Sequence, residues 1–101
     1  MLPTWIIDAA RKLGEAFQAQ RVLVFGSHAR GTATRRSDLD LFVLCETELP
    51  PLDRIEKALR LLGDLPVAVE PIVYTPKELE RRSASKFLQT ILREGVTAYE
   101  R

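Results

Sequence analysis

The 101-residue sequence predicts a mixed α/β (α+β) domain, in which a small sheet of about three to four strands packs against helices. Two patterns indicate this fold class: segments with apolar residues at helical spacing, and short β-branched apolar runs between them. The composition agrees, because 46% hydrophobic and 29% charged residues are typical of a globular domain. No repeat or linker is visible, so we expect residues 1–101 to form a single domain.

The first half of the chain is expected to contain one helix, two strands and a short helical turn. Residues 4–18 are predicted to form an amphipathic helix whose apolar stripe consists of Ile6, Ala10, Leu13 and Phe17. The apolar runs 22–25 and 39–44 have the length and composition of buried strands. Between them, Ser27 is expected to cap a helical turn that starts at His28.

The second half is expected to begin with a helix and a third strand. The helix follows the break at Pro50-Pro51 and ends at Gly63. Its apolar stripe consists of Leu52, Ile55, Leu59 and Leu62. Residues 67–74 are predicted to form a strand, and Pro71 indicates that this strand lies at a sheet edge or ends there.

The last predicted element is a single helix. Thr75 and Glu78 are spaced as a capping box, and Pro76 suits the first helical position. The helix is expected to reach about residue 94, with Gly95 as its stop. Its buried side is predicted to consist of Phe87, Leu88, Ile91 and Leu92.

Charge and cysteine content limit the class of function. The formal net charge of +1 argues against a dedicated nucleic-acid-binding domain, which usually has a marked basic excess. The single cysteine, Cys45, excludes an intrachain disulfide and is typical of a reducing compartment. The N-terminus lacks a secretory pattern and no apolar run reaches the ~18 residues of a membrane span, so we expect a cytoplasmic protein without membrane contact.

The segment 26–31 combines features that suit phosphate binding. Gly26 ends a predicted strand and has no Cβ, so backbone and ligand can approach closely there. Ser27 and the start of the helical turn present N–H groups to an anion. Arg30 can donate two hydrogen bonds to one phosphate, and Arg36 belongs to the same basic cluster. We therefore predict a phosphate cradle at the end of the first strand.

Asp38 and Asp40 are the candidate metal ligands. Side chains two apart in a strand project from the same face, so the two carboxylates are expected to lie together. Oxygen ligands of this kind suit Mg²⁺, with Mn²⁺ as the alternative. An Asp-x-Asp alone is common, and here Ser37-Asp38 can instead cap a turn while Asp40 pairs with Arg35 or Arg36. The phosphate turn upstream favours the metal site.

Gly26-Ser27, ten intervening residues and Asp38-x-Asp40, with Ala29-Arg30-Gly31 after the Gly-Ser, form a rare combination. This pattern resembles the nucleotidyltransferase family of the DNA polymerase β superfold. It is most similar to the smallest members, the MNT-type antitoxins encoded beside HEPN-domain toxins. The resemblance extends over nearly the whole chain and implies the nucleotidyltransferase fold.

The resemblance also implies the roles of the site residues. Gly26 and Ser27 are expected to hold the triphosphate, and Asp38 and Asp40 to bind two metal ions. The third carboxylate of the family is usually an aspartate on the next strand, and the matching residue here is Glu70. Glu70 is expected to complete the metal site and to help deprotonate the attacking hydroxyl. Its extra methylene and the proline that follows depart from the family pattern.

By the same resemblance, the expected reaction is transfer of an adenylyl group from ATP to a hydroxyl of a partner protein. The chain has no room for an acceptor-binding domain of its own, so we expect the acceptor to be held by another chain or to be one. The resemblance to the MNT–HEPN pairs implies that this partner is a HEPN toxin, modified on a tyrosine hydroxyl. One alternative is a catalytically weak or inactive antitoxin that neutralises its partner by binding. Another is nucleotidyl transfer to RNA or a small molecule with the help of another subunit.

Overall fold

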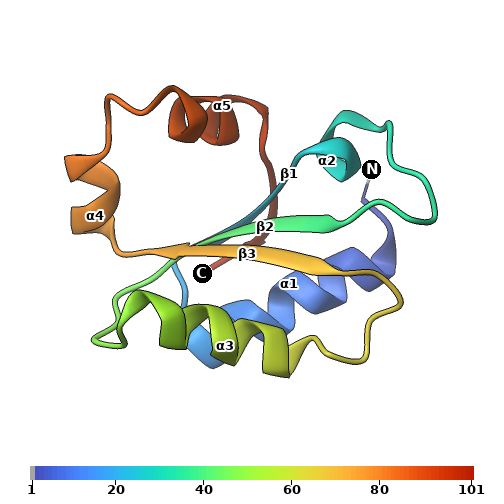
Figure 1. Cartoon of the computed structure of the whole chain (residues 1–101), viewed down its shortest axis with the longest axis horizontal. Helices are drawn as coiled ribbons and strands as arrows, with labels where there is room; N and C mark the ends of the chain where they lie inside the picture. Colours follow the sequence, from blue (N-terminus) through green and yellow to red (C-terminus); the bar gives the residue numbers. More distant parts are fainter. Residues whose placement is uncertain (1) are drawn as a thin grey trace.

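A four-stranded mixed sheet runs through the middle of the protein, with helices on both faces (Figure 1). The structure is a computed structural model that describes residues 2–101. In chain order the elements are α1 (Thr4–Phe17), β1 (Arg21–Phe25), α2 (Ser27–Arg30), β2 (Leu39–Leu44), α3 (Pro51–Leu61), β3 (Val69–Tyr74), α4 (Pro76–Arg81), α5 (Lys86–Glu94) and β4 (Val96–Glu100). The predicted mixed fold class is therefore confirmed.

The strand order β3-β2-β1-β4 determines which side chains meet at the end of the sheet. β1 pairs antiparallel with β2, and Phe25 at its end lies opposite Asp40. β2 pairs parallel with β3, which places Glu70 beside Asp40. Pro71 lies in β3 at the sheet edge, as predicted, but the pairing continues past it to Tyr74. The end of β1 and the starts of β2 and β3 therefore share one end of the sheet.

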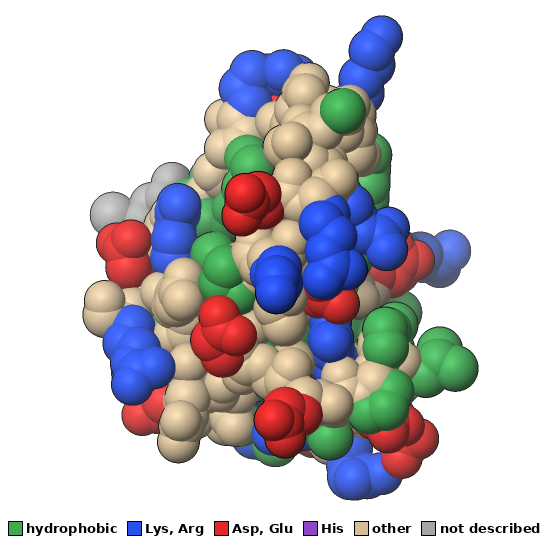
Figure 2. Space-filling model, turned by 90° about the vertical axis from the view of Figure 1, so that its left-hand side faces the viewer, with side chains coloured by type: hydrophobic (Ala, Val, Ile, Leu, Met, Phe, Trp, Pro, Cys, Tyr) green, Lys and Arg blue, Asp and Glu red, His purple; other side chains and the backbone are tan. Residues whose placement is uncertain are grey.

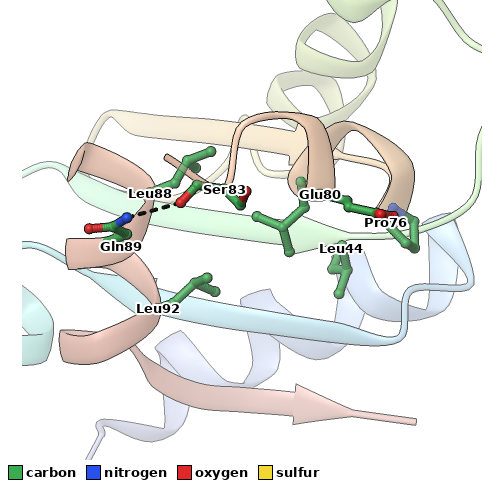
Figure 3. A pocket seen from close by; sticks show the side chains of 8 residues that line it. Leu44, Pro76, Glu80, Ser83, Leu88, Gln89 and Leu92 are labelled. Atoms are coloured by element: carbon green, nitrogen blue, oxygen red, sulfur yellow. Dashed lines mark hydrogen bonds between the residues drawn. The ribbon is translucent and has the colours of Figure 1, made fainter. Parts of the chain in front are cut away.

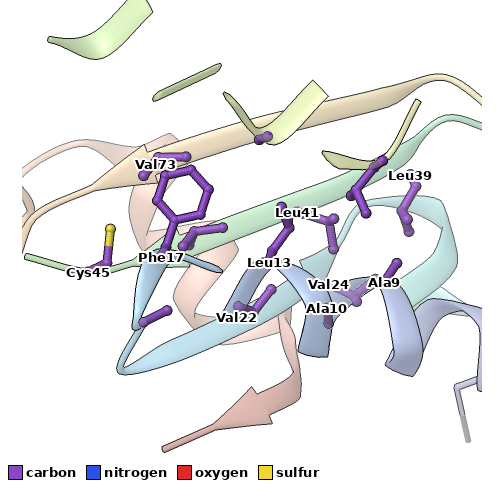
Figure 4. Packing of buried hydrophobic residues seen from close by; sticks show 14 of the residues in the cluster. Ala9, Ala10, Leu13, Phe17, Val22, Val24, Leu39, Leu41, Cys45 and Val73 are labelled. Carbon is purple, nitrogen blue, oxygen red and sulfur yellow. The ribbon is translucent and has the colours of Figure 1, made fainter. Parts of the chain in front are cut away.

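The larger hydrophobic core lies between α1, α3 and one face of the sheet (Figure 4). The predicted stripe of α1 is buried there, together with alternate residues of β1 and β2 such as Val22, Val24 and Leu41. This alternation leaves the other residues of the same strands for the opposite face. Burial of the core-facing residues of β2 therefore also directs the Asp40 side chain to the opposite face of the sheet.

The opposite face of the sheet has a smaller core under α5. Leu23 and Phe42 of the sheet pack against Leu88 and Ile91 of this helix. α2, α4 and α5 all lie on this side of the sheet in Figure 1. Between α4 and α5 runs an apolar groove over Leu44, seen from close by in Figure 3.

A buried ion pair connects three elements. Arg54 of α3 is only 6% exposed, and its Nη1 donates to Glu78 Oε1 at 2.7 Å. The guanidinium also donates to the carbonyl oxygens of Leu49 (2.7 Å) and Val73 (3.2 Å). Glu78 in turn accepts from the Thr75 amide at 2.8 Å, so the predicted capping box is confirmed. These bonds give partners to Nε and Nη1 of the guanidinium and attach α3 to the start of α4.

The prediction of a single final helix is wrong, because the chain turns at residues 82–85 and forms α4 and α5 separately. Ser85 caps the second helix by accepting from the Leu88 amide at 3.3 Å. The new helix direction buries Leu88 and Ile91 as predicted, but leaves Phe87 and Leu92 exposed at 58% and 46%.

Two further details differ from the sequence predictions. In α3 the buried residues are Arg54 and Ala58, whereas Leu52 is 79% exposed and Leu59 is also exposed. The end of the helix agrees with the prediction, because Gly63 directly follows the C-cap residue Leu62. β4, which was not predicted as a strand, pairs antiparallel with β1.

The outer surface mixes charges of both signs. On the side that carries α4, Lys and Arg side chains lie among Asp and Glu side chains (Figure 2). This distribution agrees with the net charge of +1. Within residues 2–101, no helix has both the length and the apolar character needed to cross a membrane.

Candidate functional site

The site is built around a glycine turn at the end of β1. Gly26 has φ 72° and ψ −150°, a backbone conformation that is essentially restricted to glycine. A Cβ at this position would lie closer than 3.0 Å to Oδ2 of Asp40, a separation that real Cβ atoms essentially never show. The glycine therefore allows the backbone turn to touch the Asp40 carboxyl group.

The short helix α2 starts directly after this turn. The amides of Ala29 and Arg30 both donate to the Gly26 carbonyl oxygen at 3.1 Å. Gly26 is thus the N-cap and Ser27 the first helical residue, so the prediction that Ser27 caps a helix starting at His28 is wrong. Since the first N–H groups of a helix have no partner within it, the turn retains donors for an anion.

Three carboxyl groups lie next to one another at this end of the sheet. Partial burial raises the pKa of Asp40, and the charge of Asp38 raises it further, although the hydrogen bond with Glu70 opposes the rise. The same hydrogen bond is the largest cause of a raised pKa at Glu70, and repulsion from both aspartates raises this pKa further. Crowded carboxylates of this kind are stabilised by a cation.

This arrangement fits a metal ion that the substrate helps to bind. Within residues 2–101, no group of three or more His, Cys, Asp or Glu side chains is arranged so that it can hold a metal by itself. Mg²⁺ usually binds through one or two carboxylates, with phosphate oxygens and water completing its shell. Asp38 and Asp40 fit this role beside the turn, and exposed Glu70 can approach from the neighbouring strand.

The two predicted arginines are placed differently. Arg30 lines the hollow next to Asp40, and its charge lowers the pKa of that carboxyl group. Arg36 lies outside the hollow, exposed on the loop that follows α2, where its amide donates to Thr34 Oγ1 at 3.3 Å. Arg30 is thus grouped with Gly26 and Asp40, and Arg36 is not.

The alternative interpretation of the Asp-x-Asp segment is partly correct. Ser37 does stabilise a turn, because its hydroxyl accepts from the Thr34 amide at 2.8 Å. The ion pairs found within residues 2–101 do not include Asp40, so its expected pairing with Arg35 or Arg36 is absent there. Asp40 instead faces the glycine turn and Glu70.

Sequence reasoning missed one wall of the site. A hollow of about 280 Å³ is lined on one side by Phe25, Gly26, Arg30 and Asp40, and on the other by Phe87, Thr90, Ile91 and Glu94 of α5. The spacing of Phe87, Thr90 and Glu94 along a helix could have indicated a common face. Its position over the site, however, depends on the turn at residues 82–85.

Cys45 takes no part in this site. The residue is completely buried at the end of β2, and burial raises the pKa of its thiol. A buried neutral thiol is a poor nucleophile. Cys45 is therefore a core residue, as expected.

Comparisons with known proteins point to one kind of protein. A family model described as a nucleotidyltransferase domain matches residues 5–96. A candidate protein adenylyltransferase of Methanocaldococcus jannaschii is 30% identical over 87 residues, covering 79% of this chain and 58% of that protein. The chain thus spans less than two thirds of the length of this relative.

Solved structures agree with the family model. The structure of a candidate minimal nucleotidyltransferase is 34% identical with a TM-score of 0.60, and the match covers 92% of this chain and 89% of that one. A toxin–antitoxin structure with AMP-PNP has 25% identity and a TM-score of 0.64, over 94% of this chain and 73% of that one.

Proposed function

Because this chain belongs to the nucleotidyltransferase domain family, as its motif predicted, we propose that it transfers an adenylyl group from ATP to a hydroxyl of a partner protein in an Mg²⁺-dependent reaction. The observation that supports this reaction best is the contact between the Gly26 turn and the Asp40 carboxyl group, with Asp38 and Glu70 beside it. A phosphate-binding turn and acidic side chains then face one bound nucleotide from two sides.

Each residue has a separate task in this proposal. The backbone of Gly26 and Ser27 holds the triphosphate, and Arg30 donates to one of its phosphates. Asp38 and Asp40 would hold one Mg²⁺ ion, or two when the site is fully occupied, and Glu70 would be the third carboxylate ligand. When bound, Mg²⁺ supplies charge neutralisation and Lewis-acid activation. A phosphate contact of Arg36 stays a prediction, because this residue lies outside the hollow on the loop after α2.

The chemical step is an in-line displacement. The hydroxyl oxygen of the acceptor forms a bond to the α-phosphorus of ATP, while the bond from that phosphorus to the pyrophosphate oxygen breaks. The hydroxyl proton passes to the Glu70 carboxylate, which lies at the edge of the sheet and is open to an acceptor. The protein contributes mainly position and charge, so loss of one aspartate should slow the reaction by orders of magnitude.

The acceptor in this proposal is a HEPN toxin, and the chain is its antitoxin in the cytoplasm. Two similarities support a protein acceptor. One curated relative is a candidate protein adenylyltransferase, and one structural neighbour is a toxin–antitoxin structure with the ATP analogue AMP-PNP. The neighbouring gene's product is therefore the first acceptor to test.

The proposal is tested by incubating the chain with its neighbour's product, Mg²⁺ and ATP labelled at the α-phosphate. We expect label on the partner, and its loss in Asp38→Asn and Asp40→Asn. Asp64→Asn is the matched control, because Asp64 is an exposed aspartate on the turn after α3. Absence of both label transfer and calorimetric Mg²⁺–ATP binding by the unmodified chain would refute the proposal.

A second candidate function is neutralisation of the toxin by binding, without turnover. One observation favours it: Glu70, whose side chain is one methylene longer, replaces the aspartate expected from the family. An Asp38→Asn, Asp40→Asn double variant separates the two functions. Full neutralisation of the partner by this variant supports the binding module, whereas loss of neutralisation supports the enzyme.

A further inference from the structure

We propose that the hollow between the Gly26 turn and α5 is the nucleobase pocket, in which Phe87 stacks on the base and Glu94 accepts a hydrogen bond from its amino group. This inference rests on the proposed function, because it assumes that the phosphates bind at the turn. It adds the part of the substrate that the Gly-Ser and Asp-x-Asp motifs do not contact.

The position of the hollow supports a nucleoside. Its first wall contains Gly26, Arg30 and Asp40, so one end of the hollow coincides with the phosphate and metal site. Its second wall consists of α5 residues, and its volume of about 280 Å³ is near the lower end of the range for small-molecule sites. A nucleotide with its phosphates on the turn can therefore extend its base toward α5.

Phe87 is suited to stacking. Its side chain is 58% exposed although it lies in the first turn of a helix that packs on the sheet. Its ring meets the Phe25 ring nearly at right angles, with 6.1 Å between centroids and 81° between planes. This edge contact fixes the ring and leaves aromatic surface available to a base. Stacking on such a platform is a common way to bind nucleobases.

The polar groups on the same helix face present hydrogen-bond acceptors. Thr90 Oγ1 donates its own proton to the Lys86 carbonyl oxygen at 2.9 Å, so its lone pairs remain for a ligand. The Glu94 carboxylate has only a loose pair with Arg93 at 3.6 Å, and exposed pairs of this kind are weak. A wall of acceptors matches a base with an exocyclic amine, such as adenine.

Phe87→Ala is compared with Leu92→Ala in a binding experiment. Both residues are exposed apolar side chains of α5, but Leu92 lies in the separate groove toward α4 (Figure 3). Calorimetry with Mg²⁺ should show about tenfold weaker ATP binding for Phe87→Ala and unchanged binding for Leu92→Ala. Inorganic tripolyphosphate should bind equally to all three proteins. Phe87→Leu keeps an apolar side chain without the ring and should resemble Phe87→Ala.

Glu94→Ala tests recognition of the amine. Purine riboside triphosphate differs from ATP only in lacking that amine, so it should bind the unmodified chain more weakly than ATP. Glu94→Ala should weaken ATP binding to the level of this analogue and leave binding of the analogue unchanged.

The outcomes separate this inference from the proposed function. If the unmodified chain binds neither ATP nor tripolyphosphate, the proposed function fails, and the nucleobase pocket fails with it. If the chain binds ATP but Phe87→Ala binds it equally well, only the pocket assignment is overturned. If Phe87→Ala binds ATP as tightly as the unmodified chain but no longer transfers the adenylyl group, the hollow is instead assigned to the acceptor.

Discussion

Replacing Gly26 with alanine tests whether the site depends on the contact between a backbone turn and Asp40. At φ 72° and ψ −150°, any residue with a side chain is strained by about 1–3 kcal/mol. The added Cβ also lies within 3.0 Å of Asp40 Oδ2, so the carboxyl group has to move by about 1 Å. A displacement of that size at a reacting centre lowers the rate by about 100-fold.

Gly31→Ala provides the matched control. Gly31 also has a positive φ, 78°, but its ψ of 17° is the ordinary left-handed helical value, and no atom within 4 Å would meet an added Cβ. We expect this control to lose about 1–2 kcal/mol in the free energy of unfolding and to keep its Mg²⁺–ATP affinity. Gly26→Ala should lose more stability than the control and about 100-fold in transfer rate.

A double-mutant cycle with Asp40→Ala isolates the contact itself. In that background the nearest remaining atom is the Asp40 Cβ, at an ordinary distance of 3.5 Å from the added methyl. Urea denaturation should then show that Gly26→Ala costs at least about 1 kcal/mol less than in the unmodified chain. Additive effects, or a Gly26→Ala protein as stable and active as Gly31→Ala, would refute this account of the turn.

Three further predictions concern stability. In metal-free buffer at neutral pH, Asp40→Asn should raise the melting temperature, because a neutral amide avoids burial of the charged carboxylate and its repulsion by Asp38. Calorimetry should show loss of Mg²⁺–ATP binding, and a lower melting temperature would contradict this account. The Arg54 guanidinium lowers the pKa of Glu78 from 4.5 to about 2, so this stabilisation is present above pH 4.5 and is lost as the pH falls toward 2. Urea denaturation should show that Glu78→Gln costs on the order of 2 kcal/mol at pH 7, since partial exposure screens the pair, and that the cost shrinks at pH 3. Gly14→Ala should destabilise the fold by about 1–3 kcal/mol in thermal melts, because its Cβ would enter the Tyr99 ring of β4, and Tyr99→Ala should remove most of that cost.

The residue positions at the candidate site that the sequence could predict depend on local geometry. A strand alternates its side chains, so burial of Leu39 and Leu41 on one face directs Asp40 to the other. A turn that brings backbone against a side chain requires glycine, and Gly26 is that residue. Glu70 is different, because its assignment comes from the resemblance to the family; the structure then places it beside Asp40 through the parallel register of β2 and β3.

The parts that sequence did not predict depend on contacts between distant segments. Arg54 lies outside the predicted apolar stripe of α3, and its burial is favourable only because of its partners on the Leu49 loop, β3 and α4. β4 has mostly exposed side chains, and only its hydrogen bonds to β1, about 75 residues away in the chain, identify it as a strand. The turn at residues 82–85 interrupts no apolar pattern, so the position of Phe87 over the site could not be foreseen.

Two glutamates on neighbouring segments, Glu78 and Glu70, differ in the partners that the fold provides for their carboxylates. Glu78 has a guanidinium and a backbone amide as partners, which lower its pKa to about 2, so its charge is fully satisfied within the fold. Glu70 faces Asp40 and Asp38, and their proximity raises its pKa. The fold thus gives Glu78 an ion pair, whereas the ion pairs within residues 2–101 include none of Asp38, Asp40 and Glu70, which lie at the end of the sheet beside the glycine turn. The crowding of these carboxylates, rather than the acidic residues as such, is what supports the proposal that a metal-bound nucleotide binds at this end of the sheet.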